Sequence, residues 1–357
     1  MPPRRAIIAA IGTAVPDHDI HAAFVGWVRA RLGARREAAL FDRMAKRAGI
    51  AHRWSVLPHS VTGGSPVETG GFYAGDALPP TSARMALYAE YAPALAMAAI
   101  RDLKTKTDVG DITHVVVASC TGFVAPGIDQ IIAERLGLSA SVERLLVGFM
   151  GCYAAIAALR SARHIVRSDP AARVLVVTVE LSTLHLQSDD ELESLLAMLQ
   201  FGDGAAAALV VGEGDGLSIN APFAHNLPDS AQLIRWNIGD EGFAMHLSGE
   251  VPGRIATALR DPALQSVLTG GAPLSSIDAW AVHAGGRSIL DAVGTALALP
   301  EAALATSRSV LNDCGNMSSS TLMFVLSRLF PEKPKCGVAL AFGPGLAAEG
   351  FGFGWVD

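Results

Sequence analysis

The sequence predicts an α/β protein whose sheets are covered by helices. Half of its 357 residues are hydrophobic and only 17% are charged, a composition that can form a large buried core. Short runs that are almost wholly apolar, at residues 115–119 and 174–179, are typical of strands with both faces covered. Segments with helical spacing separate these runs, and this alternation indicates helices that pack on the sheets.

The first part of the chain begins with a strand at residues 6–11 and then shows helical spacing over residues 20–53. Residues 55–80 hold four prolines and five glycines, which predicts a long loop, and loops of this length are usually functional or partly mobile. Beyond the loop we expect helices at residues 82–103, 127–136 and 152–167, and strands at residues 115–119, 145–149, 174–179 and 205–211.

The second part of the chain repeats the alternation. We expect strands at residues 280–282 and 337–342 and helices at residues 288–297 and 318–329. A glycine cluster (Gly212, Gly214 and Gly216) separates the two parts and is the best boundary between them. We therefore divide the chain into an N-terminal half, residues 1–213, and a C-terminal half, residues 214–357.

Charge and cysteine content narrow the classes of function. The formal net charge is −6, whereas proteins that bind nucleic acid are usually basic, so nucleic acid is not an expected partner. The four cysteines are too few for a disulfide framework in a chain of this size and predict a cytoplasmic protein with free thiols. No uncharged apolar stretch reaches the roughly 18 residues of a membrane span, so we expect no membrane-spanning segment.

Three polar residues stand where a turn or strand leads into a helix. Cys152 follows a glycine before a helix, whose positive end favours a thiolate. His283 ends a strand before two glycines, and Asn316 precedes a helix. Each residue also has an ordinary structural explanation. Cys152 could be a buried structural thiol, His283 is only one of ten histidines, and Asn316 could be a helix N-cap. Together they provide an activated nucleophile and two donors for a developing oxyanion, and the residue types also fit a Cys-His-Asn hydrolase.

Five segments around these residues resemble the motifs of one enzyme family. GFMGCYAAI at Cys152, HAGG at His283 and GNMSSSTLMFVL at Asn316 resemble its nucleophile, histidine and asparagine motifs. FGDGAAA and AFGPG resemble two further motifs, and all five stand in the family's order between about residues 115 and 350. The chain thus resembles the type III polyketide synthases, the chalcone and stilbene synthase family, and SCTGF at residues 119–123 is similar to the bacterial branch.

The resemblance implies a thiolase fold, an αβαβα layered sandwich of two similar halves, and a homodimer. It implies that Cys152 takes an acyl group from an acyl-CoA starter and that a protonated His283 holds the thiol as thiolate. His283 and Asn316 would polarise malonyl-CoA and stabilise the enolate that remains when carbon dioxide leaves. Iterative extension and cyclisation would give a pyrone or resorcinol-type product. No metal or cofactor is implied beyond acyl-CoA and malonyl-CoA as substrates.

The resemblance also suggests which residues surround a substrate cavity. Phe201 matches an aromatic gate between the coenzyme A tunnel and the cavity, and Met245 stands where plant enzymes carry a second phenylalanine. Trp236 falls near a position that is a small glycine in plant enzymes. Three more candidates complete the cavity group: Ser182, His185, which fits an exposed loop equally well, and Ser318.

The segment from residue 236 to residue 252 resembles bacterial alkylpyrone and alkylresorcinol synthases. A flexible methionine at position 245 can move aside for an alkyl chain, and Trp236 should redirect the chain into a different channel. We therefore expect medium to long fatty acyl-CoA starters to be preferred over an aromatic starter, with alkylpyrone or alkylresorcinol products.

A basic run lies near the start of the chain. Residues 29–53 carry eight arginines and lysines against two acidic residues. Such a run is usually a solvated helix face. Arg43 and Arg47, however, match family positions that contact the phosphates of coenzyme A, and a cationic tunnel mouth would attract that anion. A third family position, usually lysine, is Leu40 in this chain.

Other activities remain open at this point. An initiating β-ketoacyl synthase of fatty-acid synthesis has the same fold, but that family typically shows HQAN and a GNTS-like motif where this chain has HAGG and GNMSSS. A Cys-His-Asn thioester hydrolase would leave FGDG and AFGPG without a role. A non-catalytic partner protein of the same fold is disfavoured by the intact Cys, His and Asn.

Overall fold

A nine-stranded mixed sheet organises the protein, whose computed structural model describes residues 5–75 and 77–357. The strand order is β11-β12-β13-β8-β1-β7-β6-β4-β5. The pairs β4–β5, β4–β6 and β11–β12 are parallel, and the remaining pairs are antiparallel. The strands are β1 (Ile7–Ala14), β4 (His114–Ser119), β5 (Glu143–Gly148), β6 (Val174–Leu181), β7 (Asp203–Val211), β8 (Gly216–Asn226), β11 (Ala279–Val282), β12 (Gly337–Gly343) and β13 (Ala347–Val356).

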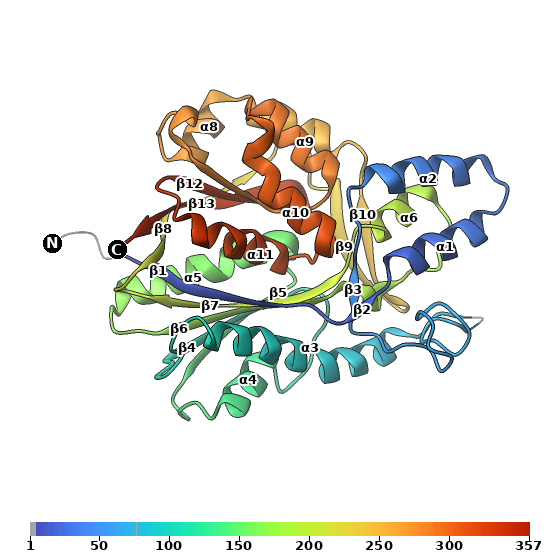
Figure 1. Cartoon of the computed structure of the whole chain (residues 1–357), viewed down its shortest axis with the longest axis horizontal. Coiled ribbons are helices and arrows are strands. Elements are labelled where there is room, and N and C mark those ends of the chain that lie inside the picture. Colours follow the sequence, from blue (N-terminus) through green and yellow to red (C-terminus); the bar gives the residue numbers. More distant parts are fainter. Residues whose placement is uncertain (1–4, 76) are drawn as a thin grey trace.

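Helices and the twisted sheet alternate in five layers (Figure 1). Helices α3 (Thr81–Lys104) and α4 (Ile128–Leu136) cover the outer face of the first half. Helices α5 (Ala154–Ser168) and α11 (Ser320–Leu329) lie in the middle and contact strands of both halves. On the far side lie α7 (Val251–Leu259), α8 (Pro262–Thr269) and α9 (Arg287–Ala296), and α10 (Ala305–Cys314) packs between α9 and α11. The predicted αβαβα sandwich is confirmed.

The buried core divides in the same way as the layers. One cluster surrounds α5 and α11, and the other two lie beneath the outer helices. Along β6, Val176 belongs to the central cluster and Val177 to the outer one, because successive side chains of a strand point to opposite faces. The sheet is therefore buried on both faces, as its apolar strands predict. No helix within the described residues is long and apolar enough to cross a membrane.

The predicted helical segment at residues 20–53 is interrupted. It forms α1 (His21–Leu32) and α2 (Arg36–Arg47), because Gly33 between them takes a positive φ of 55° that ends the first helix. Strand β2 (His18–Asp19) pairs with β3 (Trp54–Ser55), and together they bring the ends of this segment side by side. From β3 to α3, the described residues contain no helix or strand, in agreement with the predicted loop.

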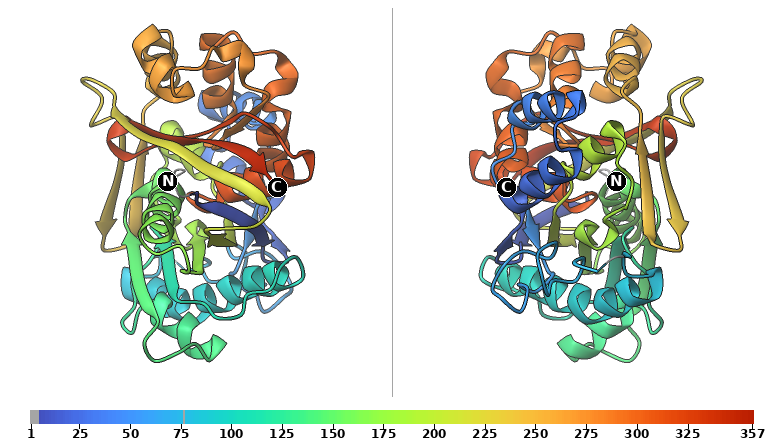
Figure 2. Two further views of the ribbon diagram at one scale, coloured as in Figure 1. Left: turned by 90° about the vertical axis from the view of Figure 1, so that its left-hand side faces the viewer. Right: turned by 90° about the vertical axis from the view of Figure 1, so that its right-hand side faces the viewer.

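Several elements after residue 190 were not predicted. Strands β9 (Ile234–Gly239) and β10 (Gly242–Leu247) form a separate hairpin along one side of the molecule (Figure 2), and helix α6 (Leu192–Met198) packs against β10. Strands β8 and β13 were also missed. The proposed boundary at residues 213 and 214 falls between β7 and β8, but β8 also pairs with β1, so the division stays a prediction. Residues 1–4 of the N-terminal half lie outside the described residues.

Candidate active site

Cys152 lies in a short 3-10 turn, η1 (Gly151–Tyr153), that leads directly into α5. Phe149, just after β5, and Gly151, the first residue of the turn, take positive φ angles of 57° and 72°. A side chain cannot replace the hydrogen of Gly151, since a Cβ there would lie 2.3 Å from Cδ of Pro344. The tight turn thus places Cys152 at the start of α5, with only 9% of the residue exposed.

The thiol of Cys152 lies within hydrogen-bond reach of the side chains of Ser318 and Asn316. Burial raises the pKa of the Cys152 thiol to about 12, and the two hydrogen bonds oppose this effect only in part. Burial thus works against the expected thiolate, which stays a prediction, because the cost of burying the charge opposes the helix-dipole effect.

His283 follows β11, and its backbone N–H donates to the carbonyl oxygen of Leu340 at 2.8 Å. The residue is 2% exposed, and neither ring nitrogen has a hydrogen-bond partner among the described residues. Burial lowers the pKa of His283 to about 3, which favours a neutral imidazole over the expected imidazolium when the ring has no charged partner. Because burial disfavours each charge alone, a thiolate and an imidazolium can form here only together, by proton transfer from Cys152.

The side chain of Asn316 connects the nucleophile to the histidine loop. Its Nδ2 donates to the carbonyl oxygen of Gly285 at 3.1 Å, and its Oδ1 accepts from the N–H of Ser318 at 2.9 Å. Gly285 itself lies against His283, since a Cβ on Gly285 would be 3.3 Å from Nε2 of that ring. Helix α11 begins at Ser320 with Ser319 as its N-cap, so the alternative that Asn316 caps this helix is wrong.

Ser318 belongs to this group rather than to the cavity where the sequence placed it. It takes a positive φ of 47°, which turns its side chain toward Cys152, and it does not line the cavity described below. The structure therefore brings together Cys152, Asn316 and Ser318, and Gly285 links this group to His283. This arrangement offers a thiol, a neutral imidazole and an amide donor around one buried point.

Sequence reasoning missed a buried carboxylate beside the nucleophile. Glu180, at 0% exposure, accepts from Oγ of Ser319 at 2.5 Å and from both the N–H of Cys120 and Oγ1 of Thr121 at 2.9 Å. Burial raises the pKa of Glu180 to about 7 against these hydrogen bonds, and its negative charge contributes to the raised pKa of Cys152. A lone glutamate in the apolar strand β6 was the available signal.

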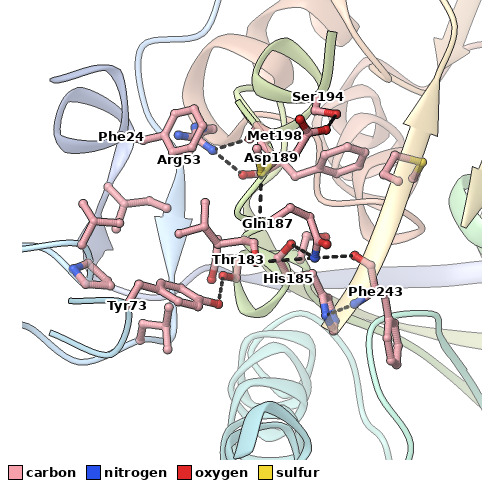
Figure 3. A pocket seen from close by; sticks show the side chains of 18 of the residues that line it. Phe24, Arg53, Tyr73, Thr183, His185, Gln187, Asp189, Ser194, Met198 and Phe243 are labelled. Atoms are coloured by element: carbon pink, nitrogen blue, oxygen red, sulfur yellow. Dashed lines mark hydrogen bonds between the residues drawn. The ribbon is translucent and has the colours of Figure 1, made fainter. Parts of the chain in front are cut away.

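A cavity of about 140 Å³ (Figure 3) has Phe201 in its wall and includes neither Cys152 nor Asn316 among the residues that line it. Phe201 lies beside the asparagine loop, because the backbone N–H of Asn316 donates to the carbonyl oxygen of Gln200 at 2.7 Å and its backbone carbonyl oxygen accepts from the N–H of Gly202 at 3.0 Å. Met245 and Trp236 line the cavity and pair across the β9–β10 hairpin. The indole N–H of Trp236 donates to the carbonyl oxygen of Cys120 at 2.9 Å, so this wall is fixed.

His185 and Ser182 also line the cavity, both from the 3-10 turn η2 (Ser182–His185) after β6. His185 is 4% exposed and stacks on Phe243 with 4.3 Å between ring centroids (Figure 3), so the alternative of an exposed loop histidine is wrong. Its Nε2 donates to the carbonyl oxygen of Thr121 at 2.7 Å, and its Nδ1 accepts from the N–H of Phe243 at 3.1 Å. Burial lowers the pKa of His185 to about 3, which makes it a neutral wall residue.

Other parts of the chain complete the cavity wall, and sequence reasoning did not name their residues. The long loop contributes Leu57, Val67 and Tyr73, and α1 contributes Phe24. Arg53 joins them from the end of the basic run. A loop that encloses a cavity agrees with the functional role expected for residues 55–80.

The two arginines expected to contact coenzyme A lie on α2, at the protein surface. Arg47 lines a groove that also includes Gln200, the residue before Phe201, and Ser288 at the start of α9. Arg43 lines a neighbouring groove together with Leu40 and Asp190. The groove at Arg47 thus reaches the residue next to Phe201 in the chain. Within the described residues, no three His, Cys, Asp or Glu side chains are grouped so that they could hold a metal ion.

Comparison with known families accounts for nearly the whole chain. The N-terminal domain of chalcone and stilbene synthases matches residues 3–214, and the C-terminal domain of the same family matches residues 218–354. Two solved structures have the same fold over almost all of both chains. PKS-I of the brown alga Ectocarpus siliculosus has a TM-score of 0.90 at 28% identity and covers 100% of each chain. The C-terminal type III polyketide synthase domain of Steely1 from Dictyostelium has a TM-score of 0.88 at 26% identity and covers 99% of this chain and 100% of that domain.

Curated relatives point to the same family. The chain is 34% identical over 289 residues to the alpha-pyrone synthesis polyketide synthase-like Pks18 of Mycobacterium tuberculosis, which covers 76% of this chain and 72% of the relative. It is 36% identical over 249 residues to 1,3,6,8-tetrahydroxynaphthalene synthase of Streptomyces peucetius, which covers 67% of this chain and 66% of the relative. These matches do not favour a β-ketoacyl synthase or a hydrolase. The chain belongs to the chalcone and stilbene synthase family and is a type III polyketide synthase, an acyltransferase that condenses by decarboxylation.

Proposed function

We propose that Cys152, His283 and Asn316 carry out the decarboxylative condensation. Cys152 passes its thiol proton to His283, attacks the acyl-CoA carbonyl carbon and releases coenzyme A, whose thiolate takes up the proton. The neutral imidazole and the Asn316 amide then donate to the thioester oxygen of malonyl-CoA, so that an enolate forms as carbon dioxide leaves. The enolate carbon attacks acyl-Cys152, the carbon–sulfur bond breaks, and the released sulfur takes up a proton from solvent, which restores the thiol.

One observation carries this assignment. The Asn316 amide lies against the Cys152 thiol and is held by Gly285, two residues after His283. Two neutral donors can stabilise an enolate without a metal or other cofactor, so we propose acyl-CoA and malonyl-CoA as the only small molecules that the reaction needs. The assay is incubation of the protein with acyl-CoA and labelled malonyl-CoA and identification of products by mass spectrometry. Free fatty acid with no carbon–carbon bond formed would contradict condensation.

We further propose that the starter is a medium to long fatty acyl-CoA and that the product is an alkylpyrone or alkylresorcinol. The cavity wall is largely apolar and contains two flexible methionines, Met198 and Met245. The relative Pks18 is named for alpha-pyrone synthesis. Trp236 is fixed by its hydrogen bond and edge-on contacts with His185 and Phe243, which supports its role in redirecting the chain.

Catalytic efficiency across a series of acyl-CoA lengths tests this starter. Each methylene buried in the channel should contribute about 0.8 kcal/mol, or roughly fourfold, until the channel is filled. Met245→Phe should shift the optimum to shorter chains, because a rigid ring cannot move aside as the thioether can. Val267→Phe, on the exposed surface of α8, is the matched control. A maximum at the shortest or an aromatic starter would contradict the proposed starter and leave the condensing activity intact.

We also propose that the enzyme is a homodimer formed through β5. This strand is at the end of the sheet and exposes its unpaired edge together with Leu145 and Leu146, each 43% exposed, near Phe123 at 44%. An apolar free edge favours pairing with a second copy. Leu146→Glu should give monomers in light scattering, while Val267→Glu, at a residue of similar exposure on α8, should remain dimeric. A monomeric wild-type protein would contradict the proposal.

Two coarser features remain proposals of the same kind. The division into halves at residues 213 and 214 is supported by the family domains, which meet between residues 214 and 218. A cytoplasmic location is supported by the four free cysteines, three of them buried.

A further inference from the structure

Arg53 is a buried cation in the cavity wall that the condensation does not use. It is 2% exposed and precedes β3, where its N–H donates to Asp19 and its carbonyl oxygen accepts from the N–H of Ile20 at 2.8 Å. Its Nη1 donates to the carbonyl oxygens of Met198 at 2.9 Å and Phe201 at 2.8 Å. The guanidinium therefore lies directly behind the Phe201 gate.

The second terminal nitrogen of Arg53 is the unusual feature. Its Nη2 is buried and has no hydrogen-bond partner among the described residues. The guanidinium carbon of Arg53 lies 4.6 Å from the ring centroid of Phe24 (Figure 3). The Cγ of Arg53 packs against Gly315, since a Cβ on Gly315 would lie 2.9 Å from it. The side chain thus lies between the cavity, which it lines, and the asparagine loop, and one of its donors has no partner among the described residues.

The charge of Arg53 is also incompletely balanced. No carboxylate of the described residues lies within 4.0 Å of its guanidinium nitrogens, although Asp19 and Asp203 attract the charge from farther away, and Nε donates to Nδ1 of His21 at 3.0 Å. Burial lowers the pKa of Arg53 to about 9, which still leaves it protonated at neutral pH. Burial raises the pKa of Asp203 to about 7, so that carboxylate is only partly ionised. An unpaired buried cation is costly unless a ligand completes it.

The reaction limits which ligand oxygen could reach this position. The phosphates of coenzyme A stay outside the gate, and an acyl starter brings no charge into the cavity. A cation on the malonyl carboxylate would oppose decarboxylation, because that negative charge must leave the carboxylate. The extended chain remains: its 1,3-dicarbonyl unit readily forms an enolate, and a 4-hydroxy-2-pyrone is an anion at neutral pH.

We propose that Arg53 binds an enolate oxygen of the β-keto chain or of the pyrone formed from it, through its free Nη2. This inference rests on the proposed polyketide synthase function and assigns the cavity a polar anchor beside its apolar wall. The anchor holds the oxygenated end of the chain near the gate, while the alkyl end extends along the apolar residues. It thereby gives the site a selectivity for anionic oxygen over neutral oxygen.

The first test uses the wild-type enzyme and two probes, 4-hydroxy-6-pentyl-2-pyrone and its 4-methoxy ether. The pair differs in the anionic oxygen, and calorimetry or product inhibition gives a dissociation constant for each. A charged hydrogen bond in a buried site predicts roughly 10- to 100-fold tighter binding of the hydroxy compound. Equal affinity for the two probes would overturn the proposal without any variant.

The second test measures the same affinity ratio in variants, so that a general loss of folded protein cancels. Arg53→Gln should bring the ratio close to one, and Arg53→Lys should retain part of it because the charge remains. Arg84 supplies the matched control, since it is 0% exposed, has an unpartnered Nη2 and donates to the carbonyl oxygens of Leu184 and Leu186, yet it does not line the cavity. Arg84→Gln should keep the wild-type ratio.

A wild-type ratio in Arg53→Gln, or loss of the ratio in Arg84→Gln alone, would contradict the role of Arg53. If Arg53→Gln does not fold, the wild-type ratio and Arg53→Lys decide the question. Failure of the proposed function is separately visible, because a wild-type protein that forms no polyketide from malonyl-CoA fails before any pyrone is compared.

Discussion

Replacing Asn316 by alanine should separate the two half-reactions of the enzyme. The amide of Asn316 has two N–H groups, of which one donates to Gly285 at 3.1 Å, and the other is free for the thiol and the bound thioester. Loss of one oxyanion donor costs about 100- to 1000-fold in rate, or about 3–4 kcal/mol of transition-state stabilisation. Decarboxylation of malonyl-CoA should fall by that factor, whereas acyl transfer to Cys152 should change little.

The same substitution also has a cost in stability. It leaves the N–H of Ser318 and the carbonyl oxygen of Gly285 without the partners seen here, at about 1–3 kcal/mol for each buried group. The backbone hydrogen bonds of residue 316 to Gln200 and Gly202 remain, so the loop should keep its path. Thermal unfolding must therefore accompany the rate measurements.

The assay follows carbon dioxide release from labelled malonyl-CoA and, separately, the mass of acylated protein after addition of acyl-CoA. Ser318→Ala is the matched control, because it removes a hydrogen bond to the Cys152 thiol and keeps the Asn316 donor. Equal loss of both half-reactions in Asn316→Ala would refute the reasoning and indicate a structural role for this side chain.

Three more predictions concern charge in and around the site. His283→Gln should lower the rate at which iodoacetamide alkylates Cys152 at neutral pH by at least about tenfold. Burial raises the pKa of that thiol to about 12, and the variant lacks the group that accepts its proton. An unchanged rate, followed by peptide mass spectrometry, would contradict this. Arg47→Glu should raise KM for acyl-CoA and weaken its salt dependence with kcat nearly unchanged, and an unchanged KM at low salt would support a merely solvated helix face. Burial raises the folded-state pKa of Glu180 from 4.5 to about 7, so the folded state binds more protons and the unfolding free energy should fall as pH rises through that interval. Glu180→Gln should flatten this decline in urea titrations, and an equal slope in both proteins would contradict the protonated carboxyl.

Most strands buried on both faces were predicted well, because a run of apolar residues can be identified in the sequence without knowing which strands lie beside it. Strand β6 and helix α4 were found within two residues of their observed ends. Strand β13 was missed because it contains alternating glycines, which suggest a loop in the sequence. In the structure, Gly350 permits close packing, since a Cβ there would lie 2.2 Å from the carbonyl oxygen of Ala339. The same Cβ would lie 2.3 Å from the Phe223 ring of β8, and such a contact with a strand far away in the sequence leaves no local pattern.

The candidate site shows the same limit. Cys152, His283 and Asn316 could be identified because each lies in a short motif with its own composition. Their protonation could not be predicted, since it depends on burial by segments far away in the sequence. Arg53 could not be distinguished from the other arginines of the basic run, because only the fold buries it beside Phe201.

The most direct test of the central claim is to identify the residue that carries the acyl group. The protein is incubated with a fatty acyl-CoA, digested and analysed by peptide mass spectrometry, and labelled malonyl-CoA is then added to a parallel sample. We expect the acyl adduct on the peptide with Cys152, its conversion to a labelled polyketide, and neither step in Cys152→Ala. An adduct on Cys120 or Cys314, or condensation by Cys152→Ala, would contradict the account.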